Sequence, residues 1–409
     1  MNLFADLHIH LGATSEGRPV KITASRRLTF ENALIEARER KGLDIVGLVD
    51  CGGEGVQRDL LQLLDQSELV ELAGGGLRYK DQVTVLTGCE IETREPRGGL
   101  AHHIAWFPFV DQLRAFSQAI SPCITNFELS SQNCGLASEQ LAQLVIEHGG
   151  LVMPAHCFTP HKSLYGASAD SFWQVFSEET ARYIPAIELG LSADSQLADM
   201  LPELEGFGFV SNSDAHSLSK LAREHNELLV EESSYEEVFK ALAGVEGRQI
   251  VANYGLDPRL GKYHRTFCET CEQRATAAPP VLQCQFCGSY KVTRGVLDRL
   301  YQLGDPERTN PARPPYIHQV PLEFVPGIGP ALRSKLHTRF GSELAVLHKA
   351  TEEEMLEVMP PKLARTLLLT REGKLPLVAG GGGKYGKAAK DLSELQLELP
   401  MGGPIEGEE

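Results

Sequence analysis

The sequence predicts an α/β fold for residues 1–256, with a parallel sheet that is either open or closed into a barrel, followed by two small modules. Three observations lead to this prediction. Short apolar runs alternate with helical stretches over the first 256 residues. Two CxxC pairs follow at 268–287, and residues 322–372 are helical by pattern around a glycine-rich turn. A chain of 409 residues is long enough for two to four such domains.

Seven apolar runs are the predicted strands of the sheet. They are Leu3–His10, Asp44–Asp50, Val83–Glu90, His103–Phe107, Leu151–His156, Ala186–Leu189 and Phe209–Ser213. Amphipathic stretches between them, such as Thr29–Lys41 and Ser138–His148, are predicted helices. Residues 53–80 are expected to form an inserted helical segment that serves as a lid.

Composition excludes several classes of protein. Hydrophobic residues make up 42% of the chain and charged residues 23%, which is typical of a globular protein. No apolar run is long enough to cross a membrane and the N-terminus lacks a signal core, so we expect a cytoplasmic protein without a membrane partner. Nine cysteines, four of them in two close pairs, indicate a metal site in a reducing compartment.

Charge is distributed unevenly along the chain. Residues 1–256 hold 19 basic and 36 acidic residues, whereas residues 257–349 hold 13 basic and 8 acidic ones. A basic middle segment in an acidic chain is typical of a separate anion-binding module.

Candidate metal ligands stand at the ends of the predicted strands. Because the carboxyl ends of barrel strands meet on one face, we expect these side chains to gather there. Imidazole and carboxylate groups together suit zinc, manganese or iron. The candidates are His8, His10, Asp50, Glu90, His102 or His103, His156, Glu188, Asp214 and His216.

The order of these motifs resembles the polymerase-and-histidinol-phosphatase (PHP) family. The resemblance rests on FADLHIH, GLVD, GCEIE, HHIAWFP, PAHCF and SNSDAH. It implies a distorted seven-stranded (β/α) barrel that holds two or three divalent metal ions, zinc or alternatively manganese or magnesium, for phosphoester hydrolysis. It also implies a bridging role for Glu90, and it favours His103 over His102. The implied ligands are His8, His10, Glu90, His103, His156, Asp214 and His216.

Two departures from the family pattern favour two metal ions over three. Cys51 follows Asp50 where the family often has a histidine, and no histidine lies between residues 11 and 101. Asp50 and His216 are then candidate third-site ligands or proton carriers, and Glu188 is expected to orient ligands or water. The candidate catalytic residues are Asp214, Glu90, Asp50 and Glu188.

Four cysteines follow with the spacing of a structural zinc ribbon. Two CxxC pairs separated by twelve residues can supply four thiolates to one tetrahedral zinc ion. The predicted ligands are Cys268, Cys271, Cys284 and Cys287.

The segment FVPGIGPALRSKL at 324–336 resembles a helix-hairpin-helix DNA-binding motif. Gly327 and Gly329 allow a tight turn, after which backbone N–H groups at the next helix start can bind a phosphate. Arg333, Lys335 and Arg339 add positive charge on or near that face. Contacts of this kind read the DNA backbone and not the base sequence.

The whole arrangement resembles the endonuclease Q family of DNA-repair enzymes. The implied domains are a PHP catalytic domain (1–256), a zinc ribbon (257–304), a Pro-rich linker (305–321), a helix-hairpin-helix-like domain (322–390) and an acidic tail (391–409). The resemblance implies a metal-dependent endonuclease that cuts DNA 5′ of a deaminated base (uracil or hypoxanthine) or an abasic site. The damaged nucleotide would be extruded into a pocket, where Phe158, Tyr165, Phe172 or Trp173 could stack on it.

Two alternatives remain open at this point. One is a PHP phosphatase that acts on a small phosphomonoester, with purely structural C-terminal modules. The other is a non-catalytic DNA-binding adaptor. DNA is the predicted partner, and a sliding clamp or another repair protein is left open as a further one.

Overall fold

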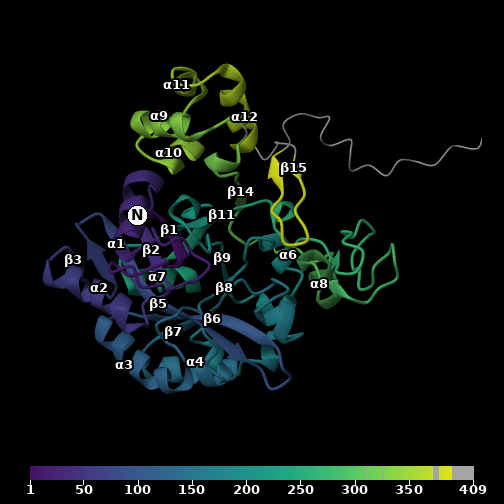
Figure 1. Cartoon of the computed structure of the whole chain (residues 1–409), viewed down its shortest axis with the longest axis horizontal. Helices are drawn as coiled ribbons and strands as arrows, with labels where there is room; N and C mark the ends of the chain where they lie inside the picture. Colours follow the sequence, from purple (N-terminus) through teal and green to yellow (C-terminus); the bar gives the residue numbers. More distant parts are fainter. Residues whose placement is uncertain (311, 326, 372–376, 389–409) are drawn as a thin grey trace, which may run out of the picture.

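The structure is a computed structural model that describes residues 1–310, 312–325, 327–371 and 377–388. The predicted acidic tail, residues 391–409, lies outside the described residues. A large mixed sheet with its covering helices forms the body of the molecule (Figure 1). Figure 1 places the helical C-terminal part at one end of this body and the four-cysteine segment at another side.

The main sheet has ten strands, in the order β14-β11-β10-β1-β2-β5-β4-β3, with β6 paired to β5 and β7 paired to β6. Only part of it is parallel. Strands β1, β2 and β5 run parallel to one another, whereas β5–β6, β6–β7 and β1–β10 are antiparallel pairs. The prediction of a parallel sheet is therefore wrong for these pairs. The ten strands are β1 (Asn2–Ile9), β2 (Ile45–Leu48), β3 (Leu69–Glu71), β4 (Leu77–Tyr79), β5 (Val83–Arg94), β6 (Leu100–Phe107), β7 (Leu151–Pro154), β10 (His225–Leu229), β11 (Gln249–Gly255) and β14 (Tyr316–His318).

Strands β8 (Ala186–Glu188) and β9 (Gly208–Val210) form a separate parallel pair. Two single backbone hydrogen bonds connect the region of β8 to the region of β7 in the main sheet. They run from Val152 N–H to the carbonyl of Tyr183 and from Cys157 N–H to the carbonyl of Glu188. On the other side, the segment after β9 meets β1 through the bridge between Ile9 and Ala215. The ladder itself is not continuous around this circuit, so the closed seven-stranded barrel stays a prediction.

One hydrophobic cluster contains a residue from each of the seven predicted strands. Its largest member is Trp106, which is completely buried. Gly47 and Gly88 leave room for it, because a Cβ at either position would lie only 2.5 or 2.7 Å from the indole. The strand members of the cluster include Ala5, Leu7, Ile45, Leu86, Ile104, Met153, Ala186 and Val210.

Helices cover the sheet. Helix α1 (Phe30–Ile35) continues into a π-helix at Glu36–Lys41, where one helix was predicted. The others around the sheet are α3 (Val110–Ile120), α4 (Ser138–Glu147), α5 (Glu178–Ala181), α6 (Ser195–Ala198) and α7 (Tyr235–Ala243).

Residues 53–80 extend the sheet and are not a lid. Helix α2 (Glu54–Asp65) is followed by β3 (Leu69–Glu71) and β4 (Leu77–Tyr79). Strand β4 pairs antiparallel with β5, and β3 pairs with β4, so the segment forms one edge of the sheet.

The C-terminal parts dock on this body. Strand β14, from the predicted linker, pairs parallel with β11. The four-cysteine segment contains β12 (Phe267–Cys268) and β13 (Val292–Thr293) and is followed by α8 (Val296–Leu303). Ion pairs from Lys41 to Glu343 (2.6 Å) and from Lys220 to Glu323 (2.5 Å) hold the helical part against the body. Its helices are α9 (Pro330–Phe340), α10 (Glu343–His348), α11 (Glu352–Leu356) and α12 (Pro361–Arg371).

A short two-stranded hairpin, β15 (Leu377–Val378) and β16 (Lys387–Ala388), ends the described chain. Within the described residues, no helix is both long and apolar enough to cross a membrane.

Candidate active site

Histidine and carboxylate side chains meet at one end of the sheet in three overlapping groups. They are His8, His10 and Glu90; Glu90, His102 and His156; and His10, Asp214 and His216. Within each group the potential ligand atoms all lie within 4.8 Å of one another. Glu90 belongs to the first two groups, so a single carboxylate is placed to bridge two cations.

The geometry of strand β1 explains why His8 and His10 both belong to the cluster. Successive side chains of a strand point to opposite faces, so His8 and His10 on β1 point the same way. Their Nε2 atoms lie 3.3 Å apart. Both face Glu90 on β5, with Nε2–carboxylate distances of 3.5 Å.

His156 and Asp214 lie just after strands and adopt left-handed backbone conformations, with φ of 31° and 44°. Such conformations are strained for residues other than glycine and are concentrated at functional sites. Gly190 leaves room for the conformation of His156, because a Cβ at position 190 would lie only 2.8 Å from Cβ of His156. The carboxylate of Asp214 comes within 3.4 Å of Nε2 of His10 and 3.7 Å of Nε2 of His8.

His102, and not His103, is the strand β6 member of the cluster. Nδ1 of His102 lies 2.9 Å from Oε1 of Glu90. His103 points to the other face of β6, where its Nε2 lies 2.7 Å from Oγ of Ser138 and its ring packs against Phe176. Burial, together with the neighbouring imidazoles, lowers the pKa of His103 to about 3. The sequence-based preference for His103 is therefore corrected, because the two-residue period of a strand allows only one of the pair to face the cluster.

Two further predicted residues lie behind the imidazoles. The carboxylate of Asp50 lies 3.0 Å from Nδ1 of His10 and accepts a hydrogen bond from the N–H of Leu11 (2.7 Å). Glu188 lies 3.0 Å from Nδ1 of His8 and accepts from the N–H of His156 (2.7 Å). Carboxylates in this position fix the ring orientation and tautomer of a metal-binding histidine. This geometry agrees with the orienting role expected for Glu188, and it favours positioning over the third-site or proton-carrier role expected for Asp50.

Opposite charges stabilise one another in this buried cluster. Burial opposes the charged form of His8, yet the attraction of Glu188 raises its pKa well above the usual value. Burial equally opposes the Glu90 carboxylate, but the charges of His102, Lys21 and His10 hold its pKa well below the usual value. Nitrogen and carboxylate donors that converge in a buried, charge-rich site fit divalent metal ions such as zinc or manganese.

Cys51 is not part of the cluster. Its thiol is buried and donates to the carbonyl of Leu48 (3.3 Å). Burial also raises the pKa of Cys51, so the thiol stays protonated and is a poor metal ligand.

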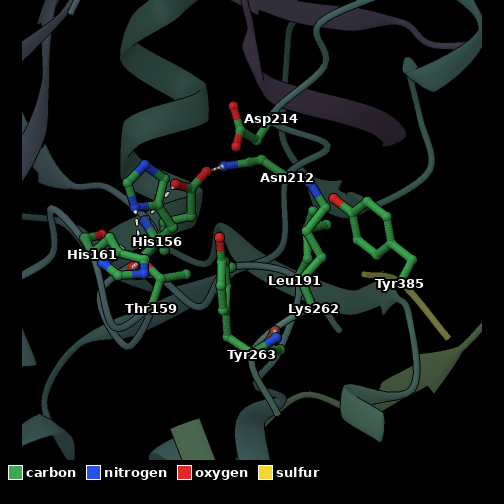
Figure 2. Close-up of a pocket in the computed structure, with 12 residues that line it drawn as sticks. His156, Thr159, His161, Leu191, Asn212, Asp214, Lys262, Tyr263 and Tyr385 are labelled. Carbon is green, nitrogen blue, oxygen red and sulfur yellow. Dashed lines mark hydrogen bonds between the residues drawn. The ribbon is translucent and has the colours of Figure 1, made fainter. Parts of the chain in front are cut away.

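A pocket of about 170 Å³ opens beside the cluster. His156, Asp214, Tyr263 and Tyr385 line this pocket, and Figure 2 shows His156 and Tyr385 on opposite sides of it. The aromatic residues proposed from the sequence lie elsewhere. Phe158, Tyr165 and Phe172 are completely buried in the core, and Trp173 lines a separate apolar groove.

Tyr385 reaches the pocket from the C-terminal hairpin (residues 377–388). The hairpin is held by backbone hydrogen bonds from Gly380 N–H to the carbonyl of Arg259 (2.7 Å) and from Gly386 N–H to that of Leu260 (2.8 Å). Arg223 donates to the hydroxyl of Tyr385 (3.1 Å), and the Lys262 ammonium lies 4.6 Å from its ring centre. No motif in the sequence indicated that Tyr385 lies at this pocket.

The four predicted zinc ligands of the ribbon do come together. The Sγ atoms of Cys268 and Cys287 are 3.6 Å apart, and those of Cys271 and Cys284 are 3.5 Å apart. All four sulfur atoms lie within 4.8 Å of one another, as a tetrahedral zinc site requires.

The glycine-rich turn of the predicted DNA-binding motif precedes α9. Gly327 has φ of +93°, which only glycine adopts easily, and Gly329 is the N-cap residue of α9. Lys335 is exposed on this helix, and Arg333 is half-buried. Arg339 is ion-paired with Glu357 at 3.1 Å.

Comparison with known proteins places the chain in a family. No family model matches it. It is 44% identical over 387 residues to the uncharacterised protein YqxK of Bacillus subtilis, which covers 94% of this chain and 98% of YqxK. Its structure matches the lesion-specific endonuclease PfuEndoQ from Pyrococcus furiosus with a TM-score of 0.81 and 33% identity, over 98% of this chain and 100% of that one.

The chain belongs to the endonuclease Q family. The resemblance predicted from the motifs is thereby confirmed. A structure of endonuclease Q bound to a 27-mer duplex, with an abasic lesion at the active site, matches with a TM-score of 0.82 and 33% identity over 97% of this chain and 98% of that one. An uncharacterised protein of Methanocaldococcus jannaschii is 39% identical over 253 residues, which is 57% of this chain and 31% of that protein.

Proposed function

We propose that this endonuclease Q family member cuts duplex DNA at the phosphodiester 5′ of an abasic site or of a deaminated base, uracil or hypoxanthine. The observation that carries the proposal is Glu90, a buried carboxylate shared by two groups of metal-ligand side chains beside an open pocket. Full-length structural similarity to a lesion-specific endonuclease supports it.

The candidate ligands divide into two sets, one for each of two metal ions. His8, His10, Glu90 and Asp214 would hold one divalent ion, and Glu90, His102 and His156 would hold the other. Zinc suits these donors best, with manganese or magnesium as alternatives. Two such ions lower the pKa of a water and stabilise the attacking and leaving oxygens of an in-line displacement.

The surrounding residues keep the imidazoles in place. Asp50 and Glu188 each hold the Nδ1 side of a histidine, which leaves Nε2 of His10 and His8 directed into the cluster. Asn212 donates to Glu188 (2.8 Å) and thereby fixes this carboxylate in turn. His216 lies next to His10, with ring centres 4.7 Å apart, and is the remaining candidate proton carrier.

The pocket beside Asp214 would receive the damaged nucleotide. An enzyme that reads one base in a duplex must extrude it, and weakened or absent pairing lowers that cost by a few kcal/mol. Tyr263 and Tyr385 offer aromatic surface at this pocket, in place of the aromatic residues proposed from the sequence.

Tyr385→Ala should lower kcat/KM on uracil-containing duplex by roughly tenfold or more, because stacking on an aromatic side chain is worth about 1–3 kcal/mol per base. Tyr385→Phe, which retains the ring, should stay within about threefold of wild type by the same reasoning. Steady-state cleavage assays of both variants make the comparison. Equal activity of all three proteins would contradict a role for the ring.

The zinc ribbon and the α9 region would bind the DNA backbone around the lesion. In this arrangement residues 257–304 and 322–390 are DNA-binding domains, and Gly327, Gly329, Arg333, Lys335 and Arg339 form the phosphate contact. Because Glu357 already neutralises Arg339, we expect Arg333 and Lys335 to contribute more.

Lys335→Ala should weaken binding to all duplexes alike and reduce the slope of log K against log salt by about one, since one phosphate contact is lost. Arg114→Ala is the matched control, because Arg114 is half-exposed on α3, outside the predicted DNA-binding parts. Fluorescence anisotropy over a range of salt concentrations gives both slopes. An unchanged slope for Lys335→Ala would remove this residue from the interface.

A substrate panel tests the proposed activity. End-labelled duplexes that carry one uracil, one hypoxanthine, one abasic site or no lesion are incubated with the enzyme and resolved on a denaturing gel. We expect a nick on the 5′ side of each lesion and none in undamaged DNA. Hydrolysis of para-nitrophenyl phosphate without any nicking would instead support the phosphatase.

A further inference from the structure

Lys21 lies inside the candidate metal centre. Its Nζ is 3.0 Å from Oε2 of Glu90. The other carboxylate oxygen, Oε1, faces His102 at 2.9 Å and His156 at 3.3 Å. The Lys21 side chain is only 14% exposed, so its ammonium is largely removed from water.

The surrounding backbone fixes Lys21 in this place. Its N–H donates to the carbonyl of Leu11 (2.9 Å), directly after His10. Ser130 N–H donates to the carbonyl of Val20 (3.0 Å) on the other side. Ser131, with φ of +57°, contacts both Nζ of Lys21 and the Glu90 carboxylate through its hydroxyl.

Three carboxylates attract the ammonium, namely Glu90, Asp50 and Asp214. A third cation bound to the cluster would be drawn to the same negative charge. The donors for such an ion are scarce, however. In the third group of described ligands, His10 and Asp214 already serve the first metal position, so His216 is the only new donor. Asp50 is engaged by His10 and Leu11, and Cys51 points away.

We propose that the Lys21 ammonium is a fixed cation of this centre that takes the place of a third metal ion, so that the centre binds two metal ions. The inference rests on the proposed function, because it concerns the same site. A lysine is a compact point charge that holds its position without open coordination sites. It repels an incoming metal ion, and it also adds positive charge where negative charge develops on the phosphate during cleavage.

The proposal makes opposite predictions for metal affinity and for activity. Lys21→Met removes the charge and retains the length of the side chain. Because one repulsive charge next to Glu90 disappears, the two metal ions of the centre should bind roughly tenfold more tightly or better. Single-turnover cleavage should nevertheless fall by roughly tenfold or more, as positive charge is lost from the reacting region. A merely structural lysine would loosen the metals when it is removed.

Metal counting and chelator competition on the full-length protein test this. Wild type should hold three zinc ions per chain, two in the histidine–carboxylate centre and one on the cysteines. Lys21→Arg, which keeps the charge, should retain this count and an affinity within about threefold of wild type. Lys240→Met is the matched control, because Nζ of Lys240 also meets three carboxylates, but at a surface site on α7.

The outcomes distinguish a failure of the proposed function from a failure of the inference about Lys21. A wild-type protein with no metal ion in the histidine–carboxylate centre overturns the proposed function and this inference with it. Three ions in this centre, or a Lys21→Met protein whose zinc affinity is unchanged or weaker, overturn the inference alone. If Lys21→Met does not fold, the ion counts of wild type and Lys21→Arg still decide, since three ions in the centre of either protein contradict a fixed third cation.

Discussion

Asp214→Asn is expected to abolish strand cleavage while DNA binding stays largely intact. The carboxylate of Asp214 lies beside both His8 and His10, lines the pocket and is 30% exposed. Asparagine has nearly the same shape but lacks the charge that a metal ion requires. We expect single-turnover cleavage to fall by roughly a thousandfold or more. Binding of an abasic-site duplex, measured by anisotropy, should change by less than about threefold, because most affinity comes from phosphate contacts elsewhere.

Asp111→Asn is the control for this prediction, since Asp111 is almost fully exposed on α3 and belongs to none of the three groups of candidate ligands. Its cleavage rate should equal that of wild type. If Asp214→Asn cleaves as well as Asp111→Asn, Asp214 is not part of the catalytic centre.

His102→Ala and His103→Ala should have opposite effects, although the residues are adjacent. His102 faces Glu90, so His102→Ala should lose a metal ion from the histidine–carboxylate cluster and reduce cleavage by roughly a hundredfold or more. His103 is buried against Ser138 and Phe176, so His103→Ala should keep its metals and lose about 1–3 kcal/mol of unfolding free energy. Metal counting and denaturant unfolding of both variants give the comparison.

Each variant serves as the control for the other. If His103→Ala loses a metal ion while His102→Ala keeps all of its metal ions, His103 is the ligand, as the sequence-based prediction held. This result would also mean that β6 lies in the opposite register to the one described.

The sequence is most informative where strand geometry dictates the outcome. His8 and His10 are two residues apart on one strand, so their common direction follows from the period of a strand. His102 and His103 show the corresponding weakness, because a shift of one residue exchanges the faces and the motif itself does not fix the register. Asp50 and Glu188 could be placed near the site, but the hydrogen bonds that make them supports for His10 and His8 depend on tertiary contacts.

The direction of β6 was not predictable from connection length. The predicted strands Val83–Glu90 and His103–Phe107 leave twelve residues between them, which is just enough for a parallel crossover. In the structure both strands are longer, and residues 95–99 alone join them, which allows only an antiparallel pair. The position of Tyr385 was not predictable either, because it depends on a C-terminal hairpin that docks on Arg259 and Leu260, and no local pattern encodes such a contact.

The most direct test of the metal centre is X-ray diffraction from crystals of the zinc-loaded protein, with anomalous data recorded at the zinc edge. We expect two anomalous peaks on either side of Glu90, one near His8, His10 and Asp214 and one near His102 and His156, and a third peak between the four cysteines. A map with the cysteine peak alone, from protein that still nicks abasic-site DNA, would contradict metal-dependent cleavage at this site.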